Sequence, residues 1–378
     1  MPVINIVTSE YFPVPAAAAA RALPWCEEIS KLGIEVRIFT SCASKNRSNL
    51  NVITSFFSIP DNRASLPVRF LQEVLLGLDL GIRILWNRKS CDGCIITSPP
   101  FFMATICAYF SKLANIPYIF DVRDRYPRVL SDLGYLNAFG LLYSTLGWLE
   151  GRIYRRAQLV STVTNGLVNE LVSSYPKGNF QLVRNGFDEL VFTDDLLNIE
   201  KRSVFSVIYH GRLGNFYNLD TYLEIMNLVY DSDKSIRFLM VGKLPLEIHL
   251  NTPPNLEILP AMKLESLSKI IGSCHLGICL LRDLPAMKNA FPAKAYDYIG
   301  AGIPVLAGPE GEFSQMVDKL NIGISFEKVS AKEVADVILE IKSNEGIWSN
   351  MCANLKKCRH DFGRRKIARE FFSELFKN

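Results

Sequence analysis

The feature that most constrains the fold of this chain is a regular alternation of short apolar runs with helix-like segments. In the first half, the apolar runs are residues 3–8, 35–40, 94–97, 118–121, 158–164 and 181–184, with helical patterns at 17–32 and 104–114. A second series has runs at residues 204–210, 237–241, 256–259, 276–281 and 304–307, and a helical pattern at 219–230. Such alternation is typical of doubly wound parallel sheets. We therefore predict an α/β fold with two Rossmann-like domains facing across a cleft.

The length of the chain supports this division. At 378 residues it exceeds the usual size of a single hydrophobic core. We predict a first domain at residues 1–190, a linker at 191–203 and a second domain at 204–362. An amphipathic helix is expected at residues 363–378. It could pack on either domain, including the first domain, to which the chain would then return.

Composition narrows the class of protein. Hydrophobic residues make up 49% of the chain and charged residues 21%, as in an ordinary globular protein. Nine cysteines without regular spacing favour a reducing compartment, so we expect a cytoplasmic protein. Neither a signal peptide nor an apolar run of about 20 residues is recognised. The CxxC at Cys91 and Cys94 has no second ligand pair, so no metal site is expected.

Residues 288–308, KNAFPAKAYDYIGAGIPVLAG, predict a helix, a glycine turn and a buried strand. Gly300 and Gly302 are expected to end the helix, because glycine accepts a positive φ at a helix C-terminus. The helix N-terminus after Phe291 would favour an anion, and Asp297 could hold hydroxyl groups. Together they would suit a sugar nucleotide, and an ordinary helix–turn–strand with one solvated carboxylate is the competing interpretation.

Other polar residues follow strands, where parallel sheets bind their ligands. In the first half, Asp121, Arg123 and Asp124 come at the end of an apolar run. They could orient a hydroxyl-rich substrate, although an internal Asp–Arg salt bridge explains the same pattern.

In the second half, small residues and cations follow the strands: Gly211, Arg212, Gly214, Lys243 and Arg282. A guanidinium or ammonium group there could meet a phosphate. No glycine-rich dinucleotide fingerprint or phosphate loop is present, which argues against NAD enzymes and NTPases. The four histidines show no paired spacing, so they give little support to a metal site or a His-centred triad.

Seven motifs in order resemble bacterial glycosyltransferases of family 4, which have the two-domain GT-B fold. They are YFP at Tyr11, ITSPPFF, IFDVRDRYP, LEGRIYRRAQLVSTVTNG, LVRNGFD, YHGRLGNF and FPAKAYDYIGAGIPVLAG. The resemblance is closest to the subgroup that builds O-antigen and capsule repeat units. It implies retaining transfer of a hexose or N-acetylhexosamine from a nucleotide sugar, most commonly UDP-linked. It also implies that no metal or other cofactor is needed.

The same resemblance assigns roles to residues. Asp297 matches the acid that binds the ribose hydroxyls, whereas Asn289 stands where the family has its first acid. Arg212 matches the arginine that neutralises the diphosphate. The lysine expected shortly after it is absent, and the candidates to replace its charge are Lys243, Arg282 and Lys294.

In the first domain, the position often held by histidine is Arg123. The resemblance therefore implies that Arg123 and Asp124 face the donor sugar or the acceptor. No nucleic-acid partner is expected.

The usual acceptor in this subgroup is a polyprenyl-diphosphate-linked sugar, or another glycan, at the inner leaflet of the cytoplasmic membrane. Residues 1–190 hold 19 basic against 15 acidic residues, and the remainder of the chain is balanced. Residues 66–89 and 136–156 could be amphipathic helices that contact this membrane. Packing of both helices on the first sheet is an equally good interpretation.

Two rival functions are considered. A sugar-nucleotide 2-epimerase shares the architecture but needs acid–base residues that are not recognised here. A non-catalytic GT-B partner protein is suggested by Asn289 and by the missing lysine.

Overall fold

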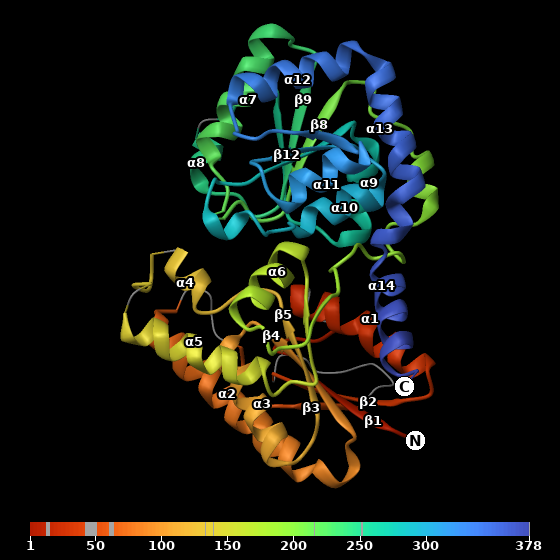
Figure 1. The fold of residues 1–378 in the computed structure, drawn as a ribbon. Coiled ribbons are helices and arrows are strands. Elements are labelled where there is room, and N and C mark those ends of the chain that lie inside the picture. The colour runs from red at the N-terminus through yellow and green to blue at the C-terminus, as the bar shows by residue number, and fades with distance from the viewer. Residues whose placement is uncertain are drawn as a thin grey trace. The chain divides into compact units, whose positions relative to one another are not determined.

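The computed structural model describes residues 1–12, 16–41, 51–59, 64–132, 134–138, 140–214, 216–250 and 252–377. Pro13 of the YFP motif and Asn215 of YHGRLGNF lie outside these residues. The chain forms two compact units (Figure 1). Unit 1 contains residues 1–184 and 367–378, and unit 2 contains residues 185–366. The chain thus leaves unit 1 before residue 190, and its last segment groups with unit 1.

Unit 1 is built on a seven-stranded parallel sheet with the order β3-β2-β1-β4-β5-β6-β7. Its strands are β1 (Val3–Val7), β2 (Glu35–Thr40), β3 (Asn51–Thr54), β4 (Gly93–Ser98), β5 (Tyr118–Val122), β6 (Leu159–Thr162) and β7 (Phe180–Leu182). The central strands β1, β4, β5 and β6 are buried along their whole length. Near-continuous apolar runs are expected in a parallel sheet covered on both faces.

Helices cover both faces of this sheet. On one face, α2 (Leu66–Trp86), α3 (Phe101–Leu113), α5 (Leu141–Tyr154) and α6 (Asn165–Ser174) close one core cluster. On the other, α1 (Ala17–Lys31) and the C-terminal α14 (Arg364–Leu375) close a second one around Trp25. The short elements α4 (Arg128–Asp132) and η1 (Arg88–Ser90) complete the unit.

Unit 2 has a six-stranded parallel sheet with the order β10-β9-β8-β11-β12-β13. The strands are β8 (Ser206–His210), β9 (Arg237–Val241), β10 (Leu256–Leu259), β11 (Leu276–Leu280), β12 (Val305–Gly308) and β13 (Gly323–Ser325). Two core clusters flank the sheet, one with α7 (Leu219–Ser232) and α12 (Ala331–Ser343) and the other with α9 (Leu264–Ser273), α10 (Ala293–Ala301) and α11 (Glu312–Leu320). The remaining elements are η2 (Asp194–Asn198), α8 (Leu246–Leu250), η3 (Pro285–Met287), α13 (Glu345–Cys358) and η4 (Arg359–Phe362).

The predicted alternation of strands and helices in two sheets is confirmed. The edge strands β3 and β13 were not predicted, and the region predicted as an irregular linker contains η2.

The prediction that both Gly300 and Gly302 end the helix in residues 288–308 is wrong for Gly300. Gly302 alone ends α10, with φ 70° in the left-handed region. Gly300 lies inside the helix, where a Cβ atom would approach the Phe187 ring to 2.8 Å. It is therefore a close-packing position.

Candidate functional site

The candidate site in unit 2 lies at the carboxyl edge of its sheet, where β8, β9 and β11 end. After β8, the Gly211 amide donates to the Val241 carbonyl at 2.8 Å, which ties this loop to the end of β9. After β11, the Arg282 amide donates to the Phe216 carbonyl at 2.8 Å. The sheet thus brings the predicted residues Gly211 and Arg282 to one edge.

Gly242 makes the close approach of two of these loops possible. Its φ is 142°, and a Cβ atom there would lie 2.4 Å from the Gly211 carbonyl oxygen. Only glycine fits such a position. Gly214, by contrast, has open space where its Cβ would be. Arg212 and Lys243 lie in these two loops, and both side chains are exposed.

A cavity of about 340 Å³ opens at the same edge. It is bordered by the beginning of α7, the residues after β11 and two segments near β12, including Arg282, Asp283, Pro309 and Lys328. Because Arg282 and Lys328 are exposed cations, the cavity can attract an anionic ligand.

The helix α10 places two ionisable groups beneath this edge. Lys294 is only 8% exposed, and its Nζ lies 3.4 Å from the Tyr209 ring centroid and 4.0 Å from that of Tyr217. Within the described residues this amine has no hydrogen-bond partner. Burial lowers the pKa of Lys294 to about 7, although Cys279 and Asp297 act in the opposite direction.

Asp297 lies one turn further along α10, with its Oδ2 3.5 Å from His210 Nε2. Burial raises the pKa of the Asp297 carboxyl to about 7, against the opposing charge of Arg364. Burial, followed by the charge of Lys294, lowers the pKa of His210 to about 3, so this imidazole is neutral at physiological pH. The site therefore holds an amine and a carboxyl that both titrate near neutrality.

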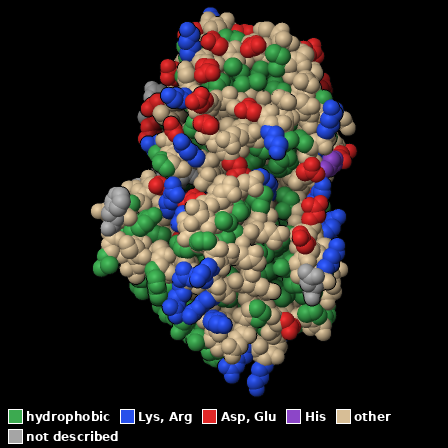
Figure 2. Space-filling model, viewed as in Figure 1, with side chains coloured by type: hydrophobic (Ala, Val, Ile, Leu, Met, Phe, Trp, Pro, Cys, Tyr) green, Lys and Arg blue, Asp and Glu red, His purple; other side chains and the backbone are tan. Residues whose placement is uncertain are grey.

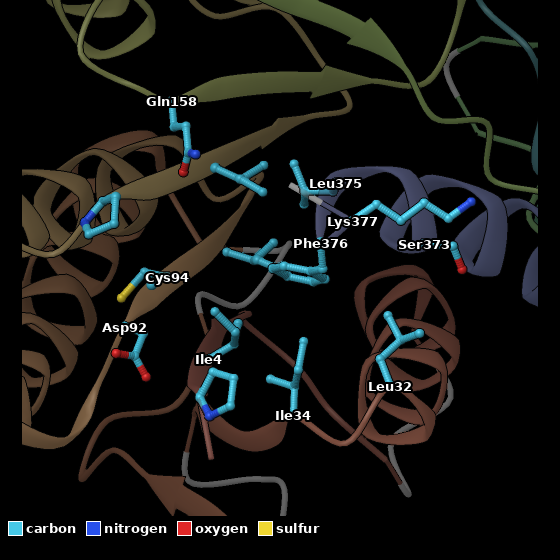
Figure 3. A pocket seen from close by; sticks show the side chains of 15 residues that line it. Ile4, Leu32, Ile34, Asp92, Cys94, Gln158, Ser373, Leu375, Phe376 and Lys377 are labelled. Carbon is cyan, nitrogen blue, oxygen red and sulfur yellow. The ribbon is translucent and has the colours of Figure 1, made fainter.

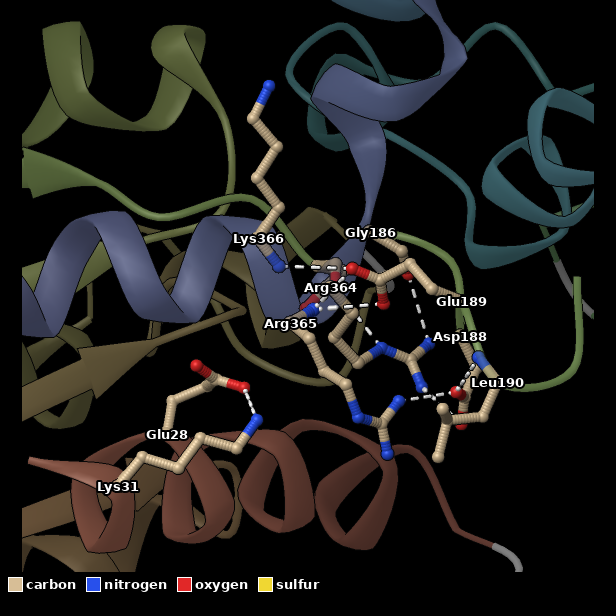
Figure 4. A network of polar contacts seen from close by, with 10 residues as sticks. Glu28, Lys31, Gly186, Asp188, Glu189, Leu190, Arg364, Arg365 and Lys366 are labelled. Atoms are coloured by element: carbon tan, nitrogen blue, oxygen red, sulfur yellow. Dashed lines mark hydrogen bonds and ion pairs between the residues drawn. The ribbon is translucent and has the colours of Figure 1, made fainter. Parts of the chain in front are cut away.

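Two residues near Asp297 were not predicted from the sequence. Arg364, at the start of α14, donates to the backbone carbonyls of Asn185 at 3.2 Å and Gly186 at 3.0 Å (Figure 4). Asp188 accepts from Arg365 Nη1 at 2.5 Å and raises the pKa of Asp297 by its charge. Glu189 accepts from the backbone amides of Arg365 and Lys366 and caps α14. No sequence signal links these residues to Asp297, because the contacts depend on how the chain leaves unit 2.

Phe291 and Asn289 precede α10. The Phe291 ring is buried and stacks on Tyr296 with centroids 4.3 Å apart, so its side chain packs in the core. Asn289 is partly buried in the segment that leads to the helix.

Unit 1 has its own group of polar residues at the carboxyl edge of its sheet. The Arg123 amide donates to the Ser98 carbonyl at 3.1 Å, and its Nη2 donates to the Pro99 carbonyl at 3.3 Å. Burial raises the pKa of Glu10, which follows β1, while the charge of Arg123 opposes this rise. Asp124 is exposed. Arg123 and Asp124 thus lie at the strand ends. Glu10, which was not predicted, lies in the same group.

Asp121 does not belong to this group. It is fully buried in β5, accepts from Arg21 at 2.7 and 2.8 Å, and accepts from the Ser161 hydroxyl at 2.8 Å. The expectation that two carboxylates flank Arg123 as substrate ligands is therefore wrong for Asp121. The internal salt bridge that was the alternative exists, but its arginine is Arg21 of α1.

A larger cavity of about 520 Å³ lies at the opposite edge of the unit 1 sheet (Figure 3). It is lined by residues at the strand starts, such as Ile4, Ile34 and Gln158, and by Phe376 of the C-terminal segment. The Asp92 carboxylate at its border already accepts from the Val3 amide at 2.7 Å. This edge is the wrong one for ligands of an open parallel sheet.

No group of three or more His, Cys, Asp or Glu side chains in the described part of the chain is arranged to hold a metal ion. Among the described helices, none combines the length and apolar character that a bilayer crossing requires.

Comparisons with known proteins agree with this architecture. The Glycosyl transferase 4-like domain model matches residues 16–186, and the Glycosyl transferases group 1 model matches residues 198–360. No curated protein matches the sequence.

Solved structures show the same fold. HepE from Anabaena, in complex with UDP-glucose, is 13% identical with a TM-score of 0.71 over 100% of both chains. The sucrose-phosphate synthase of Thermosynechococcus elongatus is 14% identical with a TM-score of 0.72 over 100% of both chains. WaaG, a glycosyltransferase involved in lipopolysaccharide biosynthesis, is 12% identical with a TM-score of 0.71, covering 99% of this chain and 100% of its own.

Two matched domains that together span most of the sequence, on two parallel-sheet units, identify the chain as a member of the family 4 glycosyltransferases with the GT-B fold.

Proposed function

We propose that this glycosyltransferase transfers a hexosyl or N-acetylhexosaminyl group from a UDP-sugar, with retention of anomeric configuration. The acceptor is a polyprenyl-diphosphate-linked sugar or another glycan in surface polysaccharide synthesis. The observation that carries the proposal is the pair of ionisable groups Lys294 and Asp297 on α10, at the carboxyl edge of the unit 2 sheet. A cavity at the same edge is bordered by the cations Arg282 and Lys328, although neither Lys294 nor Asp297 lines it. The complex of HepE with UDP-glucose supports the choice of donor.

The diphosphate is assigned to the loops after β8, β9 and β11. Arg212, Lys243 and Arg282 are exposed cations at these strand ends, and Gly211 and Gly214 leave room for close approach. Lys294 supplies the charge of the missing lysine, because an amine without a hydrogen-bond acceptor gains most from an arriving phosphate. Phe291 contributes through its backbone, just before the N-terminus of α10.

Asp297 is assigned to the ribose hydroxyls, which it can bind as a carboxylate acceptor. It is partly buried, and its Oδ2 lies 3.5 Å from Nε2 of the neutral His210. Asn289 is assigned to the donor sugar ring, as an amide in place of a carboxylate.

In this mechanism the chain stabilises the leaving diphosphate while positive charge develops at the anomeric carbon. Fixed cations do this without reorganising at the moment of reaction. Their charge takes the part that a metal ion plays in other transferases. Arg123 and Asp124 of unit 1 orient the donor sugar or the acceptor hydroxyl, and no protein nucleophile is assigned.

The protein is further proposed to be cytoplasmic and to contact the inner face of the membrane through unit 1. The helices α2 and α5 carry many exposed hydrophobic side chains, among them Leu71, Trp86 and Leu141.

To test catalysis, a panel of UDP- and GDP-sugars is incubated with the purified protein, and turnover is measured as release of the nucleotide. We expect release from one UDP-sugar, and an α-linked product from an α-linked donor when the anomeric proton is observed by NMR. Nucleotide binding without any turnover would contradict the proposal and identify a non-catalytic GT-B protein. Inversion at the anomeric carbon would contradict retention.

A further inference from the structure

The exposed hydrophobic side chains of the described residues are unevenly distributed. Of the 22 large ones, 12 lie on three helices of unit 1: seven on α2, two on α3 and three on α5. These helices pack on one another on the same face of the sheet. Figure 2 shows hydrophobic side chains over α2 and α5, with a cluster of Lys and Arg side chains beside them. An apolar surface of this kind marks a binding site more often than a free surface.

Within this surface, an open cavity of about 630 Å³ lies between α3 and α5, with Leu78 of α2 at its wall. This volume is in the range of about 300–1,000 Å³ that is usual for small-molecule sites. Its walls are mainly apolar and aromatic, and they are formed by residues such as Leu78, Ile106, Tyr109, Phe110, Trp148 and Leu149.

Three cations border the same cavity. Lys112, Arg152 and Arg156 are exposed, and none of them pairs with a carboxylate of the described residues. The Arg152 guanidinium lies over the Trp148 ring, 5.2 Å from its centroid. The cavity is thus apolar inside and positively charged at its border, and no carboxylate among the residues that the structure describes lines it.

A buried hydroxyl adds a second observation. Thr105 lines the cavity and is 8% exposed, yet its Oγ1 has no hydrogen-bond partner within the described part of the chain. A buried hydroxyl without a partner costs free energy unless a ligand supplies one.

We infer that this cavity binds one acyl chain of an anionic phospholipid, with the lipid phosphate at Lys112, Arg152 and Arg156. An ester oxygen of the lipid can accept from Thr105. Trp148 and Tyr109 then lie at the level of the head groups, where amphipathic aromatic rings are favoured. The inference rests on the membrane contact proposed above and specifies its lipid, which is distinct from the acceptor.

The charges favour a lipid over a second copy of the chain. A two-fold interface on this surface would place the same cations of both copies near one another. An anionic head group instead neutralises them with charge-assisted hydrogen bonds.

The experiment measures quenching of Trp148 fluorescence by phospholipids brominated on the acyl chain. The probes are vesicles of phosphatidylcholine, vesicles that also contain phosphatidylglycerol, and monomeric short-chain phosphatidylglycerol. In a Trp86→Phe background, which removes the other exposed tryptophan of this surface, we expect stronger quenching with phosphatidylglycerol than with phosphatidylcholine, and loss of this difference when Trp148→Phe is added.

Two variants test the cavity itself. Arg152→Glu with Arg156→Glu is expected to weaken binding to anionic vesicles at least tenfold, and Thr105→Phe to abolish quenching by filling the cavity. The matched control is Lys319→Glu with Lys332→Glu, two exposed lysines of unit 2, which should bind lipid as the wild type does. Thermal unfolding followed by circular dichroism shows whether unit 1 of each variant is folded, and the charge variant decides if Thr105→Phe does not fold.

The outcomes separate this inference from the membrane contact. Binding to anionic vesicles without quenching of Trp148 would overturn the lipid site and keep the membrane contact. Quenching by the monomeric lipid without vesicle binding would support the site and overturn the membrane contact. Dimerisation that shields Trp148 from the lipid would overturn the inference and identify a second copy as the occupant.

Discussion

At the scale of single residues, the candidate site depends on two groups whose pKa values approach neutrality from opposite directions for the same reason. Burial lowers the pKa of the Lys294 amine and raises that of the Asp297 carboxyl, each to about 7. Burial therefore destabilises the charged form of each group. A bound nucleotide would repay this cost, because it brings phosphates to the amine and hydroxyl groups to the carboxylate.

The amine gives a prediction about protons. At pH 8, Lys294 is mostly neutral in the free protein, and a neighbouring diphosphate raises its pKa. We expect UDP binding at pH 8 to take up close to one proton, measured by calorimetry in buffers of different ionisation enthalpy. Lys294→Met should bind without this uptake, and an equal uptake in this variant would rule out Lys294 as its source.

The carboxyl gives a prediction about stability. The folded-state pKa of Asp297 is raised above its unfolded value, so its burial destabilises the protein fully above pH 7 and not at all below about pH 4. Asp297→Asn should therefore increase the free energy of unfolding by about 1 kcal/mol or more at pH 8. Urea unfolding at pH 8 and pH 4 measures this, and a gain of equal size at both pH values would contradict the assigned cause.

Sequence patterns and the family resemblance proposed Lys294 and Asp297 as candidates but did not predict their environment. The glycine and proline residues around α10 predict a helix and its end, because these residues restrict the backbone locally. The contacts of Asp297 with His210, and its interactions with Arg364 and Asp188, depend on residues far away in the chain. The pairing of Asp121 with Arg21 was missed for the same reason.

At the scale of elements, the candidate site lies at a sheet edge. The loops at this edge require particular residues, such as glycine where two loops come close together. Long central strands were predictable because both faces are buried and the runs are apolar. The edge strands β3 and β13 were not predicted, although β7 and β10, with three and four residues at the other edges of the two sheets, were.

Two glycines of these loops provide a matched pair of substitutions. Gly242→Ala would place a Cβ atom 2.4 Å from a backbone oxygen at a positive φ, so it should destabilise unit 2 by about 1–3 kcal/mol. Gly214→Ala meets open space and should be close to neutral for stability. Thermal unfolding of both variants measures the difference, and equal stability of the two would contradict the described loop geometry.

At the scale of the whole molecule, the chain forms unit 1, continues through unit 2 and finishes in unit 1. Phe371 and Phe372 of α14 are buried in the core of unit 1, and the Phe372 ring meets Trp25 edge-on at 5.4 Å. The last segment is therefore part of the unit 1 fold and more than a surface helix.

Phe372→Ala tests this role. It should lower the free energy of unfolding of unit 1 by about 3–5 kcal/mol, because it leaves a cavity in the core. UDP binding by unit 2 should persist under conditions where the variant remains folded. Lys377→Ala, at an exposed position of the same segment, is the control. A stability loss of the same size in both variants would contradict the packing of Phe372.

Two parallel-sheet units could be predicted from the alternation along the sequence, and the order of motifs predicted the family. The placement of the candidate ligand edge in unit 2 follows from the order of its strands, which brings the ends of β9, β8, β11 and β12 side by side.

The central claim is that this edge of unit 2 binds the nucleotide diphosphate of the donor. Calorimetric titration with UDP tests it most directly, in the wild type and in Lys294→Met and Asp297→Ala, with Lys319→Glu as a control. We predict one site per chain, a dissociation constant at least tenfold higher in each of the two site variants, and no change in the control. Binding of equal strength in all four proteins, or no binding to the folded wild type, would contradict the claim.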